Sequence, residues 1–165
     1  MLVHRVHSVG RMEPITKVMC AVDLSHRSDA TIRAAGTIAR ELGALLDIVY
    51  VYEFPAFAAL ERASSGSDEH AASALERARA CLAEHQRIQE RLGTRVTCHL
   101  LEGSPAKALE HHIASSRPGL LVFGIRARKG IKDFYFSTVA EQVASVSDVP
   151  MIPVDLRGEH EATKP

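Results

Sequence analysis

Two stretches of the 165-residue sequence carry the side chains best suited to binding an anion. Asp23 ends a short apolar run at Val18–Val22, and the segment Gly124–Gly130 follows a second apolar run at Gly119–Phe123. In open parallel sheets, ligands bind outside the carboxyl ends of the strands, where neighbouring crossovers diverge to opposite faces. If both runs are strands of one such sheet, Asp23 and the segment after Phe123 flank a single crevice.

The segment after Gly124 leads to a helix start that can hold a phosphate. Ser137, Thr138 and Val139 would present free backbone N–H groups and the positive end of the helix dipole, and Thr138 would add a hydroxyl donor. A purely structural role also fits, because Thr138-Val-Ala-Glu141 matches a reciprocal capping box. The spacing alone leaves both interpretations open.

The charged residues near this crevice also have two interpretations. Asp23 either caps or pairs with the helix that follows it, or it holds a ribose or a metal-bridged phosphate. The loop carries four cations within seven residues, which would favour phosphate oxygens if they face the crevice and are otherwise solvated. These cations are Arg126, Arg128, Lys129 and Lys132.

Other chemistry has little support in the sequence. His99, His111 and His112 lack a partner set with ligand spacing, so we expect no metal site. The phosphate-binding G-x-x-x-x-G-K-[ST] loop, the G-x-S-x-G elbow, the H-E-x-x-H motif and a G-x-G-x-x-G after the first strand are all absent. The pattern favours a binding module over an enzyme, without deciding between them.

The amino-acid composition argues against nucleic acid and membranes as binding partners. Twenty basic residues balance twenty acidic ones, so no overall field draws the chain to nucleic acid or to an anionic membrane. No run approaches the roughly 20 apolar residues of a membrane helix, and an apolar signal-peptide core is missing at the start. We therefore expect a cytoplasmic protein, with a flexible leader at 1–14, one domain at 15–157 and a flexible tail at 158–165.

The elements that would position these residues alternate along the chain. Apolar and β-branched runs predict strands, and residues at helical spacing between capping and stop signals predict helices. Such alternation predicts an α/β, Rossmann-like domain in which helices cover both faces of one open, five-stranded parallel sheet. We expect strands at 18–22, 45–52, 95–101, 119–123 and 151–154, and helices at 28–42 with Ser28 as the cap, 68–92, 105–115 and 138–146.

Along nearly all of positions 15–157, the sequence resembles the universal stress protein family. Lys17–Ser25 is similar to the family's opening strand and acid, Glu102–Ala106 to its third-strand turn, and Leu120–Gly124 to its fourth strand. The resemblance implies strand order 3-2-1-4-5, an adenine site lined near Val51 and Phe123, and homodimers formed through the fifth strand. Pro153 lacks an N–H group, which would weaken pairing at that edge.

The nucleotide-binding branch of that family carries a loop of glycine, two residues, glycine, nine residues, glycine, and then serine or threonine. Gly124 and Thr138 match the first and last positions of this loop, whereas Ala127 and Ser137 replace the second and third glycines. A non-glycine residue costs roughly 1–2 kcal/mol where the backbone needs a positive φ. We expect weakened binding of ATP or AMP, with Mg²⁺ accompanying a triphosphate.

Two functions follow from the resemblance. The first is a stress-response module in which a bound nucleotide biases the loop at 53–66 and so the binding of an unknown protein partner. The second is a nucleotide-free dimeric interaction protein, as in the other branch of the family. A weak ATP hydrolase is a third interpretation, but the sequence offers no identifiable base for it.

Overall fold

The computed structural model describes residues 14–53, 68–125 and 138–155. Over these ranges, strands and helices alternate as predicted, and the observed ends lie within two residues of the expected ones. The strands are β1 (Lys17–Val22), β2 (Leu45–Tyr52), β3 (Val96–Glu102), β4 (Leu120–Ile125) and β5 (Met151–Asp155). The helices are α1 (Ser28–Leu42), α3 (Asp68–Arg91), α4 (Pro105–Ser116) and α5 (Thr138–Val146).

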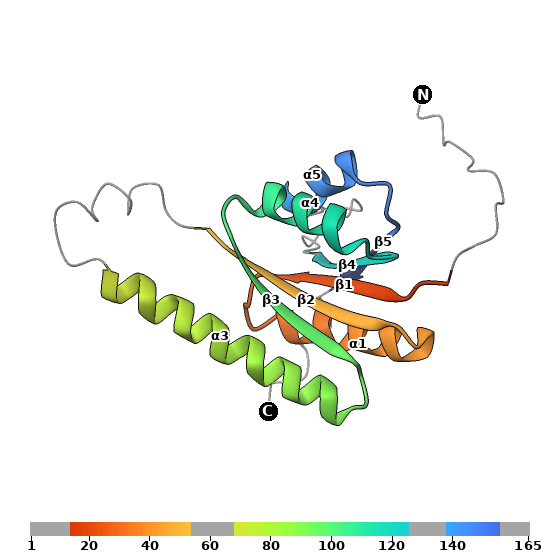
Figure 1. Ribbon diagram of the computed structural model, residues 1–165, viewed down its shortest axis with the longest axis horizontal. Coiled ribbons are helices and arrows are strands. Elements are labelled where there is room, and N and C mark those ends of the chain that lie inside the picture. Colours follow the sequence, from red (N-terminus) through yellow and green to blue (C-terminus); the bar gives the residue numbers. More distant parts are fainter. Residues whose placement is uncertain (1–13, 54–67, 126–137, 156–165) are drawn as a thin grey trace, which may run out of the picture.

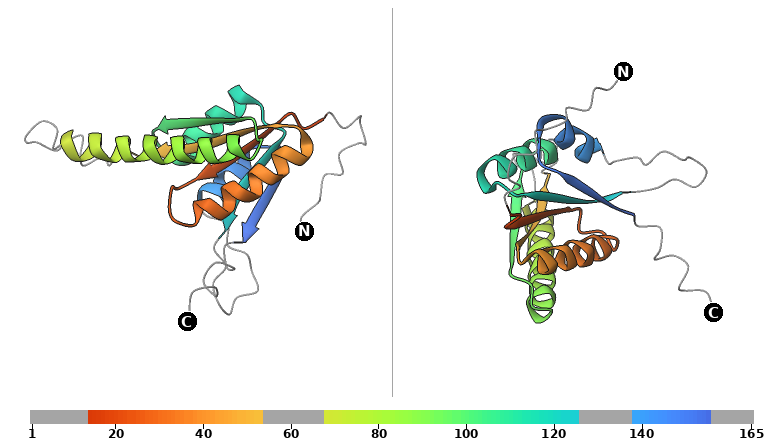
Figure 2. Two further views of the ribbon diagram at one scale, coloured as in Figure 1. Left: turned by 90° about the horizontal axis from the view of Figure 1, so that it is seen from below. Right: turned by 90° about the vertical axis from the view of Figure 1, so that its right-hand side faces the viewer.

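The strands form one sheet in the order β3-β2-β1-β4-β5, and every neighbouring pair is parallel. Helices α1 and α3 cover one face of the sheet, and α4 and α5 cover the other (Figures 1 and 2). The predicted fold class and the strand order implied by the family resemblance are therefore confirmed. Among the described residues, no helix combines the length and the apolar character needed to cross a membrane.

Each face of the sheet has its own core, because successive side chains of a strand point to opposite faces. From β1, Val18 and Cys20 pack with Ile32 of α1 in one fully buried cluster. Met19 lies between them in the sequence and packs with Ile113 of α4 in the other cluster. Burial of β1 on both faces explains its continuous apolar run.

Three turns position the helices. Gly43 ends α1 in the left-handed conformation, at φ 63°, and its N–H group bonds to the carbonyls of Ala39 and Arg40. Ser104 and Pro105 occupy the N-cap and first-turn positions of α4 as predicted. The prediction that Ser28 caps α1 was wrong, because the cap position is held by Arg27 and Ser28 already belongs to the helix.

Candidate functional site

Three strands bring the predicted nucleotide-site residues to the carboxyl edge of the sheet. Ala21 of β1 is level with Val49 of β2 and with Phe123 of β4. Val51 lies two residues beyond Val49, Gly124 follows Phe123, and Asp23 comes directly after β1. The register therefore places Asp23, Val51 and Gly124 at one edge, as expected.

Asp23 is exposed, and its carboxylate holds the turn that leads into α1. The Oδ1 atom accepts hydrogen bonds from the Ser25 N–H group, at 3.0 Å, and from the Ser28 hydroxyl, at 3.1 Å. Leu24, inside this turn, has a positive φ of 53°. These bonds fix the turn before α1, and the predicted capping or ion-pairing role of Asp23 in the helix itself stays a prediction. A role toward ribose or phosphate stays a prediction.

The two side chains expected near adenine differ in burial. Phe123 is 5% exposed and belongs to the core cluster that also contains Ala140 and Val143 of α5. Val51 is partly buried and packs against the edge of the same cluster. The Phe123 ring is therefore a core group, and of the two side chains only Val51 keeps substantial exposed surface at this edge.

Helix α5 starts where the phosphate-binding helix was predicted. Thr138 is its first residue, and the partly buried Val139 packs against the core beneath it. Arg126, Ala127 and Ser137 lie outside the described residues, so their predicted places beside a phosphate stay predictions.

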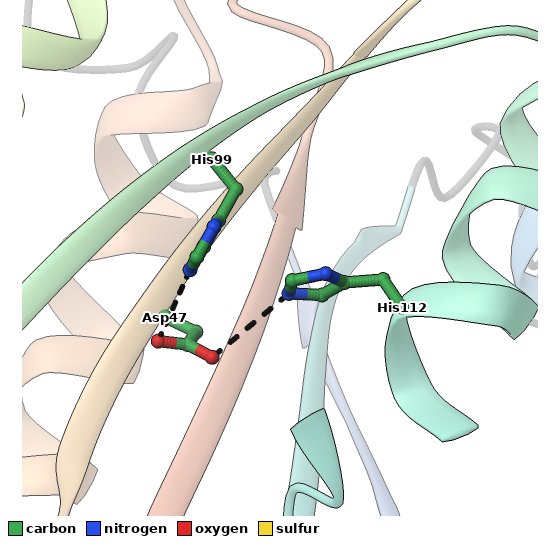
Figure 3. Close-up of side chains that lie close together, drawn as sticks. All are labelled: Asp47, His99 and His112. Atoms are coloured by element: carbon green, nitrogen blue, oxygen red, sulfur yellow. Dashed lines mark ion pairs between the residues drawn. The ribbon is translucent and has the colours of Figure 1, made fainter. Parts of the chain in front are cut away.

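A second polar cluster lies on the face of the sheet that α4 and α5 cover. Asp47 of β2, His99 of β3 and His112 of α4 point toward one another (Figure 3). Their ligand atoms all lie within 4.8 Å of one another. The Nε2 atom of His99 is 3.5 Å from Asp47 Oδ1, and that of His112 is 4.0 Å from Asp47 Oδ2.

Asp47 sits at the centre of this cluster and is almost completely buried, with 1% of its surface exposed. Thr97, its register partner on β3, donates a hydroxyl hydrogen bond to Oδ1. The Lys17 ammonium lies 3.5 Å from Oδ2 and also donates to the Ser116 carbonyl at the end of α4. Lys17 therefore supplies a positive charge beside an otherwise buried carboxylate.

The two imidazole rings are in contact, with centroids 4.6 Å apart and planes tilted by 55°. Burial, followed by the neighbouring His99, lowers the pKa of His112 below its ordinary value. His112 therefore favours the neutral form around neutral pH.

The sequence alone does not predict this cluster, because His99, His111 and His112 lack a partner set with ligand spacing. The acidic ligand, Asp47, lies on a different strand. The sequence does contain one feature that points to the cluster, the single acidic residue Asp47 inside the apolar strand Leu45–Tyr52. A carboxylate buried in such a strand requires compensating partners.

Comparisons with known proteins agree with the fold. Residues 14–154 match the sequence profile of the universal stress protein family. The chain is 26% identical over 139 residues to universal stress protein MJ0531 of Methanocaldococcus jannaschii, and the alignment covers 84% of this chain and 81% of that protein.

Two of the matching solved structures were determined with nucleotides. A universal stress protein of Archaeoglobus fulgidus in complex with dAMP has 19% identity and a TM-score of 0.60, over 86% of this chain and 98% of that one. A universal stress protein in complex with cAMP has 22% identity and a TM-score of 0.62, over 87% of this chain and 99% of that one. At these identities the structural matches establish the shared fold.

Proposed function

Because this chain belongs to the universal stress protein family, we propose that it is a cytoplasmic stress-response module that binds ATP or AMP at the carboxyl edge of its sheet. The main support for this proposal is the placement of two helices. The helices that follow the neighbouring strands β1 and β4, namely α1 and α5, lie on opposite faces of the sheet. The carboxyl ends of β1 and β4 therefore form a switch point, the position at which doubly wound sheets bind their ligands.

The described residues at this switch point fit a nucleotide in part. The exposed Asp23 and the partly exposed Val51 and Gly124 lie at one edge, and α5 begins at Thr138 with the spacing to Gly124 that the family's binding loop requires. The start of α5 offers N–H groups and a favourable dipole to a phosphate. Related proteins solved with cAMP and with dAMP support an adenine nucleotide as the ligand class. A bound triphosphate would bring Mg²⁺.

The test is a direct titration of the purified chain with ATP and with AMP. Replacing Ala127 and Ser137 with glycine should strengthen binding about five- to thirty-fold, because the variant removes a cost of roughly 1–2 kcal/mol at positive φ. Thr138→Ala in that background should weaken binding again by removing a phosphate donor. Comparing affinities with melting temperatures separates this loss from a general loss of folding stability.

A clear result decides between the proposal and its alternative. If the double-glycine variant binds neither ATP nor AMP more tightly than the original chain, the loop is not a nucleotide site. The alternative is a nucleotide-free dimeric interaction protein, which the replacement of two loop glycines by Ala127 and Ser137 favours.

We also propose a homodimer formed through β5. This strand is at the edge of the sheet, and its Ile152 is 38% exposed. Pro153, level with Phe123 of β4, offers no N–H group to a further strand, so side-chain packing rather than a continuous ladder would have to hold the two copies together. Light scattering at high micromolar concentration tests this, and Ile152→Lys should shift a dimer to monomer. A monomeric mass for the unmutated chain would contradict it.

A further inference from the structure

We infer that Asp47, His99 and His112 form a binding site for a divalent first-row transition-metal ion, with Zn²⁺ as the best match. Two imidazoles and one carboxylate are a ligand set that Zn²⁺ takes in proteins when one coordination position stays open to water or to another ligand. The site lies on β2, β3 and α4 and shares no residue with the proposed nucleotide site. Its presence or absence is therefore independent of that proposal.

The separations of the three groups suit a common ion. Zinc lies about 2.0–2.2 Å from imidazole nitrogen and carboxylate oxygen, so two ligand atoms on a tetrahedral ion are roughly 3.4 Å apart. His99 Nε2 and Asp47 Oδ1 are already 3.5 Å apart, and His112 Nε2 and Asp47 Oδ2 are 4.0 Å apart. The three ligand atoms, one from each residue, all lie within 4.8 Å of one another, so side-chain rotations that shorten these separations by roughly 1 Å would bring them onto one ion.

Two of the atoms that would bind the ion have unmet bonding capacity. Asp47 Oδ2 and His112 Nε2 are both buried, and neither has a hydrogen-bond partner among the described residues. The Asp47 side chain is 2% exposed and that of His112 is 13% exposed. Buried polar atoms are nearly always hydrogen-bonded in native proteins, and these two face each other without a hydrogen bond, although the Lys17 ammonium lies 3.5 Å from Oδ2. A metal ion between them satisfies both at once.

The surroundings hold the ligands in place and leave a route to solvent. Two of the ligands are on neighbouring strands and the third is on a helix packed over them (Figure 3). The Thr97 hydroxyl orients the Asp47 carboxylate, as outer hydrogen bonds do for ligating carboxylates. The His99 side chain is 35% exposed, so an ion can enter beside it.

Lys17 is the competitor for this carboxylate. Its ammonium is 3.5 Å from Asp47 Oδ2. In the metal-free protein, Lys17 therefore balances the negative charge of the carboxylate, which is the role that a bound metal ion would take. Bound Zn²⁺ and the Lys17 ammonium would repel each other. The repulsion between two unit charges about 4 Å apart changes affinity about fivefold, even at the dielectric constant of water. Lys17→Met removes this repulsion and should therefore tighten Zn²⁺ binding about fivefold or more.

The experiment is calorimetric titration of the untagged, nucleotide-free chain with Zn²⁺, together with visible absorption spectra of the Co²⁺ form. The expected result is one Zn²⁺ per chain at micromolar affinity or tighter, and Co²⁺ bands with the intensity of a four- or five-coordinate ion. His99→Ala and His112→Ala should each weaken binding by at least about tenfold. His111→Ala is the matched control, because His111 neighbours His112 on α4 but is exposed, and its affinity should not change.

Several outcomes would overturn the inference. One is the absence of saturable one-to-one Zn²⁺ binding by the unmutated chain. Another is binding that survives both His99→Ala and His112→Ala while their circular dichroism spectra remain native. A third is binding that falls with His111→Ala as much as with His112→Ala, or that weakens in Lys17→Met. Because His99 is partly exposed, its variant should fold even if replacing His112 disturbs the core.

Discussion

Replacing Gly36 with alanine tests how tightly α1 packs against α3. Gly36 is buried on α1, and a Cβ atom at this position would clash with Oε1 of Gln89 on α3 and lie 2.9 Å from its Cδ atom. Gln89 is 1% exposed, and its Oε1 accepts hydrogen bonds from Thr94 Oγ1 at 3.3 Å and Arg40 Nη1 at 3.5 Å. The new methyl group therefore displaces a buried, hydrogen-bonded amide.

Two opposing contributions set the size of the effect. Alanine stabilises a helix interior by up to about 1 kcal/mol relative to glycine. Displacing the Gln89 amide from its partners costs about 1–3 kcal/mol, and overpacking costs a similar amount when the site cannot relax. We expect Gly36→Ala to lower the free energy of unfolding by about 1–2 kcal/mol, or the melting temperature by roughly 2–8 °C. Urea denaturation measures the change.

A double-mutant cycle with Gln89→Ala provides the control. Without the Gln89 side chain, the alanine at position 36 has room, so Gly36→Ala should become stabilising by up to about 1 kcal/mol in that background. The sign of the substitution should therefore reverse between the two backgrounds. Equal stabilisation in both would show that the Gln89 amide moves aside at no cost, and would refute the packing argument.

Three further changes test the core and the carboxyl edge. Leu121→Ala should destabilise the chain by about 2–5 kcal/mol in urea denaturation, because Leu121 is fully buried, whereas Leu42→Ala at a 47% exposed position should change stability by about 0.5 kcal/mol or less. Asp23→Ala should cost about 0.5–1.5 kcal/mol, since the Ser25 N–H group and the Ser28 hydroxyl lose their acceptor, and an unchanged urea midpoint would contradict this. Burial raises the pKa of Cys20 to about 12, so a short pulse of thiol reagent at pH 8 should label the partly exposed Cys81 well before Cys20, as mass spectrometry can show.

The fold could be predicted from local patterns because they act over short distances. The apolar run at Val18–Val22 and the glycine at 43 each determine structure within a few residues, and β-α alternation then restricts the topology. The N-cap of α1 was misplaced by one residue, because Ser28 has the residue type of a cap but its hydroxyl bonds to Asp23 instead. Such a choice depends on a partner five positions away, which residue preferences do not contain.

The residues at the carboxyl edge of the sheet could be predicted from the sequence, whereas the Asp47 cluster could not. Asp23 and Gly124 stand next to strand ends, and every parallel sheet brings its carboxyl ends together. Asp47, His99 and His112 instead meet through the register of β2 with β3 and through the packing of α4 over them. Their proximity follows only once that register is fixed.

A lone acid in a buried strand nevertheless narrows the search for its partners. Asp47 is level with Met19 on one neighbouring strand and with Thr97 on the other. Side chains at every second residue share a face, so the candidates for compensating the charge are Thr97 and, one step along each strand, Lys17 and His99. All three contact the Asp47 carboxylate in the structure. Once the register is known, strand parity applied outward from the buried charge identifies Lys17, Thr97 and His99, but not His112, whose place depends on how α4 packs.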